Sequence, residues 1–399
     1  MTADVHRRPG PAPGADGLRV MISCGEASGD LYAGGLVSAL RQLEPAIDVF
    51  GFGGPRMAAA GARLSGDFRG ISVTGLVEAL RVVPRSWLML RRLADEAARL
   101  RPDVFVAIDF PDFNFRLLPV MKKLGIPVVY YVSPQLWAWR EGRIETLKKY
   151  VGRMLVIFPF ETEMYQKAGV PVEFVGHPMV DLAVPTRDRT DVLAAAGLDS
   201  LRPVVALLPG SRRNELTEIL PTLADAAILI ARRVPRVQFL VARAPALDDA
   251  LFEPLARLRE AGLPVAILSE SADDVLGASD VVVTASGTAT IQAALHGRPM
   301  VIVYRLAALT YGIARRFVRV NTYGMVNLVA GKPIVPELIQ HHFTAEAVAA
   351  EVEPLLNDGV RAGDMRQALA SVRVRLGAPG ASARAAAAIL RVATAGPGS

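Results

Sequence analysis

Short apolar runs alternate with longer stretches of helical periodicity along almost the whole chain. Apolar runs of this length, bounded by turn residues and separated by helical patterns, are typical of parallel strands that helices cover on both faces. Helices are predicted at Leu31–Leu43 and Asn214–Val234. The predicted strands are Leu18–Ser23, Ile47–Phe52, Asp103–Ile108, Pro127–Val132, Arg153–Phe158 and Val172–Val175 in a first series, and Pro203–Leu208, Val237–Ala242, Val265–Leu268, Val281–Thr284 and Met300–Tyr304 in a second.

The interruption between the two series, after GHPMVD (176–181), predicts a linker between two domains, because the chain there becomes polar and contains Pro185. Two consecutive doubly wound domains bind ligands in the cleft between them, at the carboxyl ends of their strands. We therefore expect an α/β protein with two doubly wound, Rossmann-like domains that face a cleft. The predicted parts are a disordered tail at 1–17, domains at 18–182 and 183–378, and a terminal segment at 379–399 with a helix at Ala381–Ala395, whose packing on the first domain is left open.

Composition supports two buried cores and excludes several other classes of protein. Hydrophobic residues make up 51% of the 399 residues and charged residues 21%. The single cysteine, Cys24, excludes an intramolecular disulfide and a cysteine-rich zinc site. A net charge of +6 is mild for this length, so no nucleic-acid partner is predicted. No uncharged apolar run approaches the roughly 20 residues of a membrane-spanning helix, and residues 1–17 lack the hydrophobic stretch of a secretory signal.

Two segments of the second domain are candidate anion sites. PGSRRNE (209–215) and TASGTAT (284–290) each follow a predicted strand and open a helix. Helix starts offer backbone N–H donors and the positive end of the helix dipole, and Arg212 adds a charge-assisted bond to a diphosphate. The alternative is that Ser211 and Ser286 are ordinary turn and cap residues. Two such segments in one sheet favour the phosphate site.

Two carboxylates of the first domain are candidates for acid–base chemistry. Asp109 follows the strand DVFVAI, and Glu26 follows the first strand, so both lie where doubly wound domains present functional side chains. A carboxylate that faces a cleft can act as a general base. Asp112 is a rival for that role, and a loop-capping Asp is the structural alternative. Pro111 is expected to keep FPDFNF from continuing as a helix.

Other motifs give weaker indications. GFGGPRM (51–57) has Arg56 where a dinucleotide loop has its third glycine, and a P-loop motif is absent, so no cofactor is predicted. His177 is better explained by packing than by ligation, and the histidines, including the pair at 341–342, form no recognisable metal set, so no protein-held metal is predicted. Trp137 and Trp139 suit either a sugar or acyl site or the core, and the core is favoured.

An amphipathic stretch at 73–101 combines apolar side chains with a local excess of arginine. A second arginine-rich segment lies at 305–319. This composition suits the surface of an anionic bilayer, and the alternative is a core-facing helix with a basic, solvated back. The candidates for membrane or acyl contact are Val73, Leu76, Val77, Leu80, Trp87 and Leu88.

The ordered motifs together resemble the lipid-A-disaccharide synthases, a family of inverting glycosyltransferases with the glycosyltransferase-B architecture. The resemblance extends along nearly the whole chain, and so many motifs in one order make a chance match improbable. The motifs are GEASGD (25–30), GFGGPRM (51–57), TGLVEAL (74–80), IDFPDFN (108–114), YYVSPQLWAWR (130–140), FPFE (158–161), VGHPM (175–179), LLPGSR (207–212), ASGTA (285–289), YR (304–305) and NLVAG (327–331).

The resemblance implies transfer of 2,3-diacylglucosamine from its UDP donor to lipid X, the 2,3-diacylglucosamine 1-phosphate acceptor, giving a β-linked disaccharide 1-phosphate and UDP. It implies a first domain that faces the acceptor and the cytoplasmic face of the inner membrane, a second domain that binds the UDP-sugar, and no metal. Asp109 would be the base that deprotonates the acceptor's primary hydroxyl, and Glu26 would orient the acceptor or the reacting sugar. The donor site would contain Ser211, Arg212, Ser286, Gly287, Thr288, Gln292 and Asn327.

Gln292 is a departure, because the family's pattern has Glu at this position, where it contacts the ribose. Two rival functions remain: a non-hydrolysing UDP-sugar epimerase, which has no use for the amphipathic stretch at 73–101, and a membrane-surface sensor that binds UDP-sugar without turnover, which has no use for a base at Asp109. Acyl-chain selectivity and oligomeric state are left open.

Overall fold

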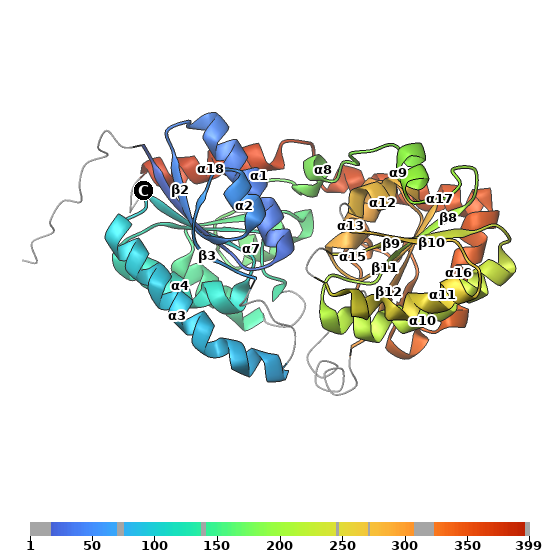
Figure 1. Ribbon diagram of the computed structural model, residues 1–399. Helices are drawn as coiled ribbons and strands as arrows, with labels where there is room; N and C mark the ends of the chain where they lie inside the picture. Colours follow the sequence, from blue (N-terminus) through green and yellow to red (C-terminus); the bar gives the residue numbers. More distant parts are fainter. Residues whose placement is uncertain are drawn as a thin grey trace, which may run out of the picture.

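The computed structural model describes residues 17–69, 76–136, 141–244, 247–269, 272–306 and 323–395, with the backbone alone at 76–82 and 141. It contains two parallel sheets in two lobes (Figure 1), with strand orders β3-β2-β1-β4-β5-β6-β7 and β10-β9-β8-β11-β12-β13. The strands are β1 Arg19–Cys24, β2 Asp48–Gly53, β3 Arg63–Asp67, β4 Val104–Ile108, β5 Val128–Tyr131, β6 Arg153–Val156, β7 Val172–Phe174, β8 Val204–Leu208, β9 Gln238–Ala242, β10 Val265–Leu268, β11 Val281–Ala285, β12 Met300–Tyr304 and β13 Glu337–Ile339.

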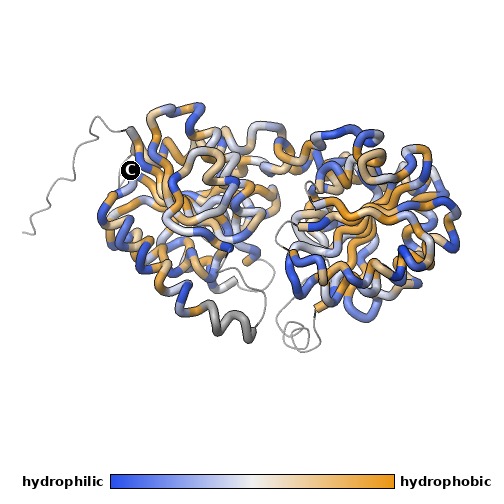
Figure 2. Tube along the Cα trace, in the orientation of Figure 1, coloured by the Kyte–Doolittle hydropathy of each residue, from blue (hydrophilic) through white to orange (hydrophobic). Residues whose placement is uncertain are grey.

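Every predicted strand is confirmed, with ends that differ by at most two residues. Most of their side chains are buried, although those of β7 and β10 are half-buried. Figure 2 shows the strands as the apolar centre of each lobe. Two edge strands, β3 and β13, were not predicted, because RLSGD and ELI are too short or too polar to register as apolar runs.

Helices lie on both faces of each sheet (Figure 1), as expected of doubly wound domains. The two predicted long helices are confirmed as α1 and α10. The helices are α1 Ala27–Leu43, α2 Pro55–Ala59, α3 Leu76–Leu100, α4 Pro111–Leu124, α6 Ile144–Tyr150, α7 Pro159–Lys167, α8 Met179–Leu182, α9 Arg189–Ala195, α10 Arg213–Arg233, α11 Ala256–Glu260, α12 Ala272–Ala278, α13 Thr288–Leu295, α15 Met325–Ala330, α16 Ala345–Asn357, α17 Gly359–Arg375 and α18 Ala381–Ala395.

The last helix, α18, returns to the first lobe and packs along α1 (Figure 1). The Asp181 carboxylate fixes its start by accepting the N–H groups of Gly380, at 2.9 Å, and Ala381, at 3.2 Å. The chain therefore crosses between the lobes twice, near 183–188 and again near 376–380. His177 lies beside the second crossing, where its backbone N–H donates to the Leu376 carbonyl at 2.8 Å.

His177 is buried against the rings of Tyr32 and Phe158, and its Nδ1 accepts the Met179 N–H at 3.1 Å. Burial lowers the pKa of His177 to about 3, so the ring is neutral at physiological pH. The structure therefore agrees with a packing role for this residue.

Candidate active site

The turn from β4 into α4 presents Asp109. Asp109 and Phe110 both have left-handed backbone conformations, with φ of 44° and 48°, which non-glycine residues rarely adopt. The expectation that Pro111 prevents a helix here is wrong, because Pro111 is the first residue of α4. The first helical position needs no N–H donor, and the fixed φ of proline already suits it.

The strained turn is held by three hydrogen bonds. The Asn114 amide donates to the Asp109 carbonyl at 2.8 Å, and the Tyr130 hydroxyl donates to the same oxygen at 2.7 Å. Asn114 also accepts the Ser23 hydroxyl at 2.7 Å, which ties the turn to β1. Gly25 completes the packing, because a Cβ there would lie 2.1 Å from the Phe110 ring. Strain that its surroundings hold in this way is characteristic of functional sites.

The Asp109 carboxyl group is enclosed by protein on most sides, although part of the residue reaches the surface. Burial, reinforced by the negative charge of Glu26, raises the pKa of Asp109 to about 7. A carboxyl group with this pKa exchanges protons near neutral pH. Asp112, by contrast, has a 70% exposed side chain and binds Arg143 at 2.7 Å, so it is a surface ion pair and a poor rival.

Glu26 lies at the same edge of the sheet as Asp109, because β1 and β4 are neighbours and Cys24 pairs with Ile108. It is the residue before α1, a helix whose Asp30 carboxylate accepts the N–H groups of Gly54, Arg56 and Met57. The motifs GEASGD and GFGGPRM are therefore joined by hydrogen bonds into one corner of the first domain.

The start of α10 differs from the expected phosphate cradle. The Glu215 carboxylate accepts the backbone N–H groups of Ser211, at 2.9 Å, and Arg212, at 3.3 Å. An acid in the first turn caps its own helix in this way, so these donors are occupied. The expectation that these N–H groups are free is therefore not met in the described structure, whereas the role of Ser211 and Arg212 at a diphosphate stays a prediction.

As predicted, α13 starts directly after β11. Gly287 precedes the helix with φ 151°, a conformation that favours glycine, and the helix has no side-chain cap. The Ser286 hydroxyl donates to the Tyr323 carbonyl at 2.9 Å. Since β8 and β11 pair directly, with Leu208 opposite Thr284, the starts of α10 and α13 lie side by side. An anion at α13 is therefore close to Arg212.

Two contacts join the domains at this place. Arg212 donates to Glu26 at 2.6 Å and to Glu215 at 3.1 Å, so the cationic group of the second domain reaches the carboxylate beside Asp109. The Tyr32 phenol lies close to the Thr288 side chain of the second domain, and burial raises the pKa of Tyr32. The structure thus brings together Asp109, Glu26, Arg212 and the start of α13, which the sequence places far apart.

Asn327 is directed into its own domain. It is 2% exposed, its amide nitrogen donates to the Val335 carbonyl and to Glu337 at 2.9 and 2.8 Å, and its amide oxygen accepts the N–H groups of Ile334 and Val335. All four hydrogen-bonding positions of this amide are occupied by protein. Glu337 in turn holds the N–H groups of Tyr323 and Gly324. Asn327 therefore holds the loop next to Ser286 in shape, and its place in the donor site stays a prediction.

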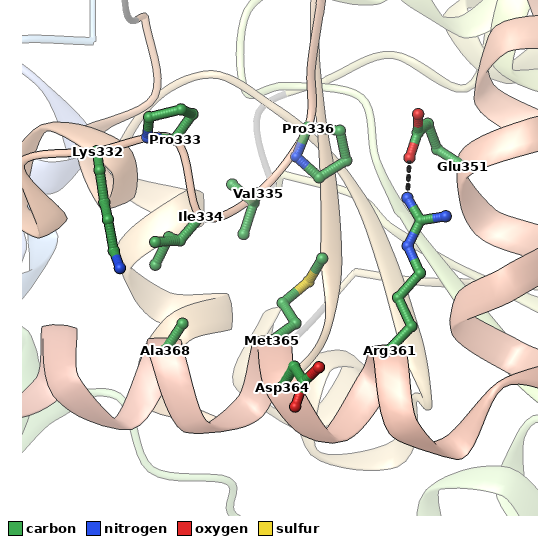
Figure 3. Close-up of a pocket in the computed structure, with 10 residues that line it drawn as sticks. All are labelled: Lys332, Pro333, Ile334, Val335, Pro336, Glu351, Arg361, Asp364, Met365 and Ala368. Atoms are coloured by element: carbon green, nitrogen blue, oxygen red, sulfur yellow. Dashed lines mark hydrogen bonds and ion pairs between the residues drawn. The ribbon is translucent and has the colours of Figure 1, made fainter.

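A cavity of about 510 Å³ lies elsewhere in the second domain, between the 332–336 loop and helices α16 and α17 (Figure 3). Its rim carries the Arg361–Glu351 ion pair, at 2.6 Å. None of the predicted site residues lines it. The cavity is therefore separate from the candidate active site.

The amphipathic stretch is only partly described. Val73 lies outside the described residues, and so do the side chains of Leu76, Val77 and Leu80. Trp87 and Leu88 are 51% and 67% exposed on α3, and Arg91 lies over the Trp87 ring at 4.0 Å. In the second arginine-rich segment, Arg305 is directed to Thr222 and the Phe343 ring of its own domain. Residues 307–319 lie outside the described residues, as do Trp137 and Trp139.

Three residues that contact the candidate site residues were not identified from the sequence: Tyr32, Glu215 and Asp273. Glu215 follows Arg212 by three residues, the spacing of a capping box, so this pattern was available as a signal. Asp273 accepts a hydrogen bond from the Gln292 amide nitrogen at 3.2 Å, and nothing in the local sequence indicates this pairing.

Among the described residues, no group of three or more His, Cys, Asp or Glu side chains is placed to hold a metal ion. No helix in the described ranges is long and apolar enough to cross a membrane.

Comparison with known families gives a match along almost the whole chain. A family model described as "Lipid-A-disaccharide synthetase" matches residues 20–391. The lipid-A-disaccharide synthase of Geobacter metallireducens is 44% identical over 381 residues, which cover 95% of this chain and 98% of that protein. The protein of the same name from Myxococcus xanthus is 43% identical over 375 residues, covering 94% and 97%.

Solved structures share the fold at much lower identity. A UDP-GlcNAc 2-epimerase from Neisseria meningitidis, bound to UDP-GlcNAc, has a TM-score of 0.67 at 12% identity, covering 94% of this chain and all (100%) of that one. The glycotransferase of kitacinnamycin has a TM-score of 0.63 at 19% identity, covering 95% and 100%. At these identities the likeness concerns the fold alone, two Rossmann-like domains of the glycosyltransferase-B type.

Proposed function

The chain belongs to the lipid-A-disaccharide synthase family, and from this premise we propose that it joins two acylated glucosamine units. The donor is UDP-2,3-diacylglucosamine and the acceptor is lipid X, 2,3-diacylglucosamine 1-phosphate. The products are the β-linked lipid A disaccharide 1-phosphate and UDP. The observation that carries this proposal is the meeting of the Asp109 and Glu26 carboxylates with Arg212 and the start of α13 across the two domains.

Asp109 is the general base in this proposal. Its carboxylate accepts the proton of the acceptor's primary hydroxyl as the hydroxyl oxygen attacks C1 of the donor sugar. The bond from C1 to the diphosphate oxygen breaks on the opposite side, so the configuration at C1 inverts. A pKa of about 7 suits this role, because the group is substantially ionised at neutral pH and still basic enough to take the proton. Glu26 contacts the acceptor or the reacting sugar beside it.

The second domain stabilises the leaving group. UDP gains negative charge as the C1–O bond breaks, and the start of α13 offers backbone N–H donors and a positive dipole end to that charge. The Arg212 guanidinium adds a charge-assisted bond when it turns from Glu26 toward the diphosphate. Ser286, Gly287 and Thr288 form the phosphate contact, and Gln292 reaches the ribose. With this charge supplied by protein groups, we expect the reaction to proceed without a metal ion.

The proposed acyl-chain and membrane face is the exposed apolar part of α3. Val83, Trp87 and Leu88 are each more than half exposed, whereas Leu93, one to two turns further along, is buried in the core. Apolar side chains beside Arg91 and Arg92 suit the interface of an anionic bilayer. The proposed location is accordingly the cytoplasmic face of the inner membrane, with the protein held peripherally.

A direct assay separates this function from its rivals. Wild-type protein is incubated with UDP-2,3-diacylglucosamine and lipid X, and the products are followed by mass spectrometry. The proposal requires a disaccharide 1-phosphate and one UDP for each linkage formed. An epimerase would instead convert UDP-GlcNAc without any acceptor, and a sensor would bind the donor and release no UDP. Either result would replace the proposed function.

A further inference from the structure

Gln292 lies on the face of α13 that borders the donor site. It follows Thr288 by four residues, and residues so spaced lie above one another on one side of a helix. Thr288 is the first residue of α13, directly after the carboxyl end of β11, and it lies close to Tyr32 of the opposite domain, so this side of α13 faces the cleft. Gln292 is half-buried one turn behind that contact.

Asp273 determines how the Gln292 amide is oriented. Both hydrogen bonds described for this side chain leave from its nitrogen, to the two Asp273 oxygens at 3.2 and 3.4 Å. An ionised carboxylate only accepts hydrogen bonds, so the amide must turn its NH₂ group toward Asp273. The amide oxygen is thereby directed away from the carboxylate. An isolated Gln could present either atom, whereas this one presents an acceptor.

Asp273 is itself held in place. His296, one further turn along the same face of α13, bonds the Asp273 carboxylate through Nε2 at 2.9 Å. The next residue, Asp274, is 2% exposed and accepts the backbone N–H groups of Thr186 and Arg187 in the interdomain linker, at 2.6 and 3.2 Å. Helices α12 and α13 are in contact (Figure 1). The carboxylate therefore has a fixed place beside Gln292.

We propose that Asp273 is a positioning residue that fixes the Gln292 amide oxygen as the acceptor for the ribose hydroxyls of the donor. This inference rests on the proposed UDP-sugar site and adds the group that replaces the carboxylate expected there. It also explains why position 292 holds an amide. A Glu at 292 would put two carboxylates within about 3–4 Å of each other, where like charges repel.

The test uses the full-length protein and compares binding of UDP with that of 2′,3′-dideoxy-UDP by calorimetry. We expect the wild type to prefer UDP by about tenfold, the scale of one or two hydrogen bonds to a ribose. Asp273→Asn should abolish most of this preference, because an Asn amide can donate to the Gln292 oxygen and let the amide reverse. Asp225→Asn, a surface carboxylate of the same domain paired with Arg257, is the matched control and should keep the preference.

A charge exchange provides the rescue. Gln292→Glu alone should weaken UDP binding, because it creates the repelling pair, and the double variant Asp273→Asn with Gln292→Glu should restore both affinity and the preference for ribose. A double variant no better than Gln292→Glu, or an Asp273→Asn variant that keeps the full preference, would overturn the inference. Thermal unfolding of each variant shows whether a loss reflects folding, in which case the double variant decides. If the wild-type protein binds no UDP, the proposed donor site itself is contradicted.

Discussion

The two sides of the cleft are built in opposite ways. On the first domain, Asp109 lies in a strained turn that hydrogen bonds from Asn114 and Tyr130 hold, and its pKa is raised to about 7. On the second, Ser286 and Gly287 form an unstrained helix entry whose groups suit a bound anion. A strained backbone and a shifted pKa are typical of catalytic residues, whereas the N–H groups at a helix start are typical of anion-binding sites. The comparison supports our proposal that the first domain provides the base for bond formation and that the second domain binds UDP.

The largest effect should come from Asp109. We expect Asp109→Asn to lower turnover by about 10² to 10⁴, the usual contribution of a general base, while the affinity for UDP stays within about twofold. Initial rates and calorimetry with UDP measure the two separately. Asp112→Asn is the control and should leave both almost unchanged, since its carboxylate is a surface ion pair. A larger loss from Asp112→Asn would move the base to that residue.

Arg212 should show the reverse pattern, with binding affected directly. A hydrogen bond to a charged group contributes about 1.5–3 kcal/mol, and we expect Arg212→Ala to weaken UDP binding near the lower end, about tenfold. The reason for the smaller value is that Arg212 leaves Glu26 when it binds the diphosphate, so one contact replaces another. Arg213→Ala, next to it and paired with exposed Asp248, is the control. Equal UDP affinity in both variants would mean that Arg212 only joins the two domains and does not bind the diphosphate.

Changes to the membrane face should weaken binding to lipid vesicles and leave the affinity for UDP unchanged. Replacing Trp87 and Leu88 with Ser removes two exposed apolar side chains, and at roughly 25 cal/mol per Å² this should reduce sedimentation with anionic vesicles several-fold. Leu201→Ser is the control, because Leu201 is 87% exposed in the second domain, away from α3. Loss of thermal stability in the double variant, with vesicle binding unchanged, would show that these side chains serve packing.

The smallest effect concerns pH. The base form of Asp109 is required, so kcat/KM should fall as pH decreases through about 7. Glu26 raises the pKa of Asp109 by repulsion, and Arg212 opposes it, so Glu26→Gln should move this acidic limb to lower pH. A limb that stays in place, or moves to higher pH, would mean that Glu26 does not act on Asp109 electrostatically.

The raised pKa of Asp109 also determines how the stability of the folded protein changes with pH. An unfolded Asp ionises near its ordinary pKa of 3.8, whereas folded Asp109 stays protonated up to about 7. Between these values the folded state binds more protons, so this group makes the protein less stable as pH rises, and the loss is complete above about 7. Asp109→Asn removes the loss and should unfold at a higher temperature than wild type at pH 8, an increase that disappears near pH 4.

Much of this arrangement could be predicted from the sequence, because buried parallel strands are continuous apolar runs and their carboxyl ends mark the cleft. That logic located Asp109, Glu26 and the start of α13 correctly at strand ends. Sequence reasoning failed for residues whose contacts depend on the direction of the side chain or on a partner distant in the sequence. Asn327 belongs to a matching motif but is directed inward, and the occupied start of α10 depends on where the Glu215 side chain turns.

Contacts between the domains could not be predicted at all. Arg212 and Glu26 are 186 residues apart, and their meeting depends on how the two sheets face each other. The pairing of Asp273 with Gln292 depends in the same way on the packing of α12 against α13. Local pattern carries no information on such contacts, because each residue alone is compatible with a surface position.

Stereochemistry at the new linkage tests the division between the two domains most directly. Wild-type enzyme is supplied with UDP-2,3-diacylglucosamine, whose sugar is α-linked, and lipid X, and the anomeric configuration of the disaccharide is read by NMR. In-line attack by a hydroxyl that Asp109 deprotonates predicts a β linkage with one UDP released for each disaccharide, and no disaccharide above about one hundredth of that rate from Asp109→Asn. An α linkage, or a fully active Asp109→Asn variant, would contradict the account.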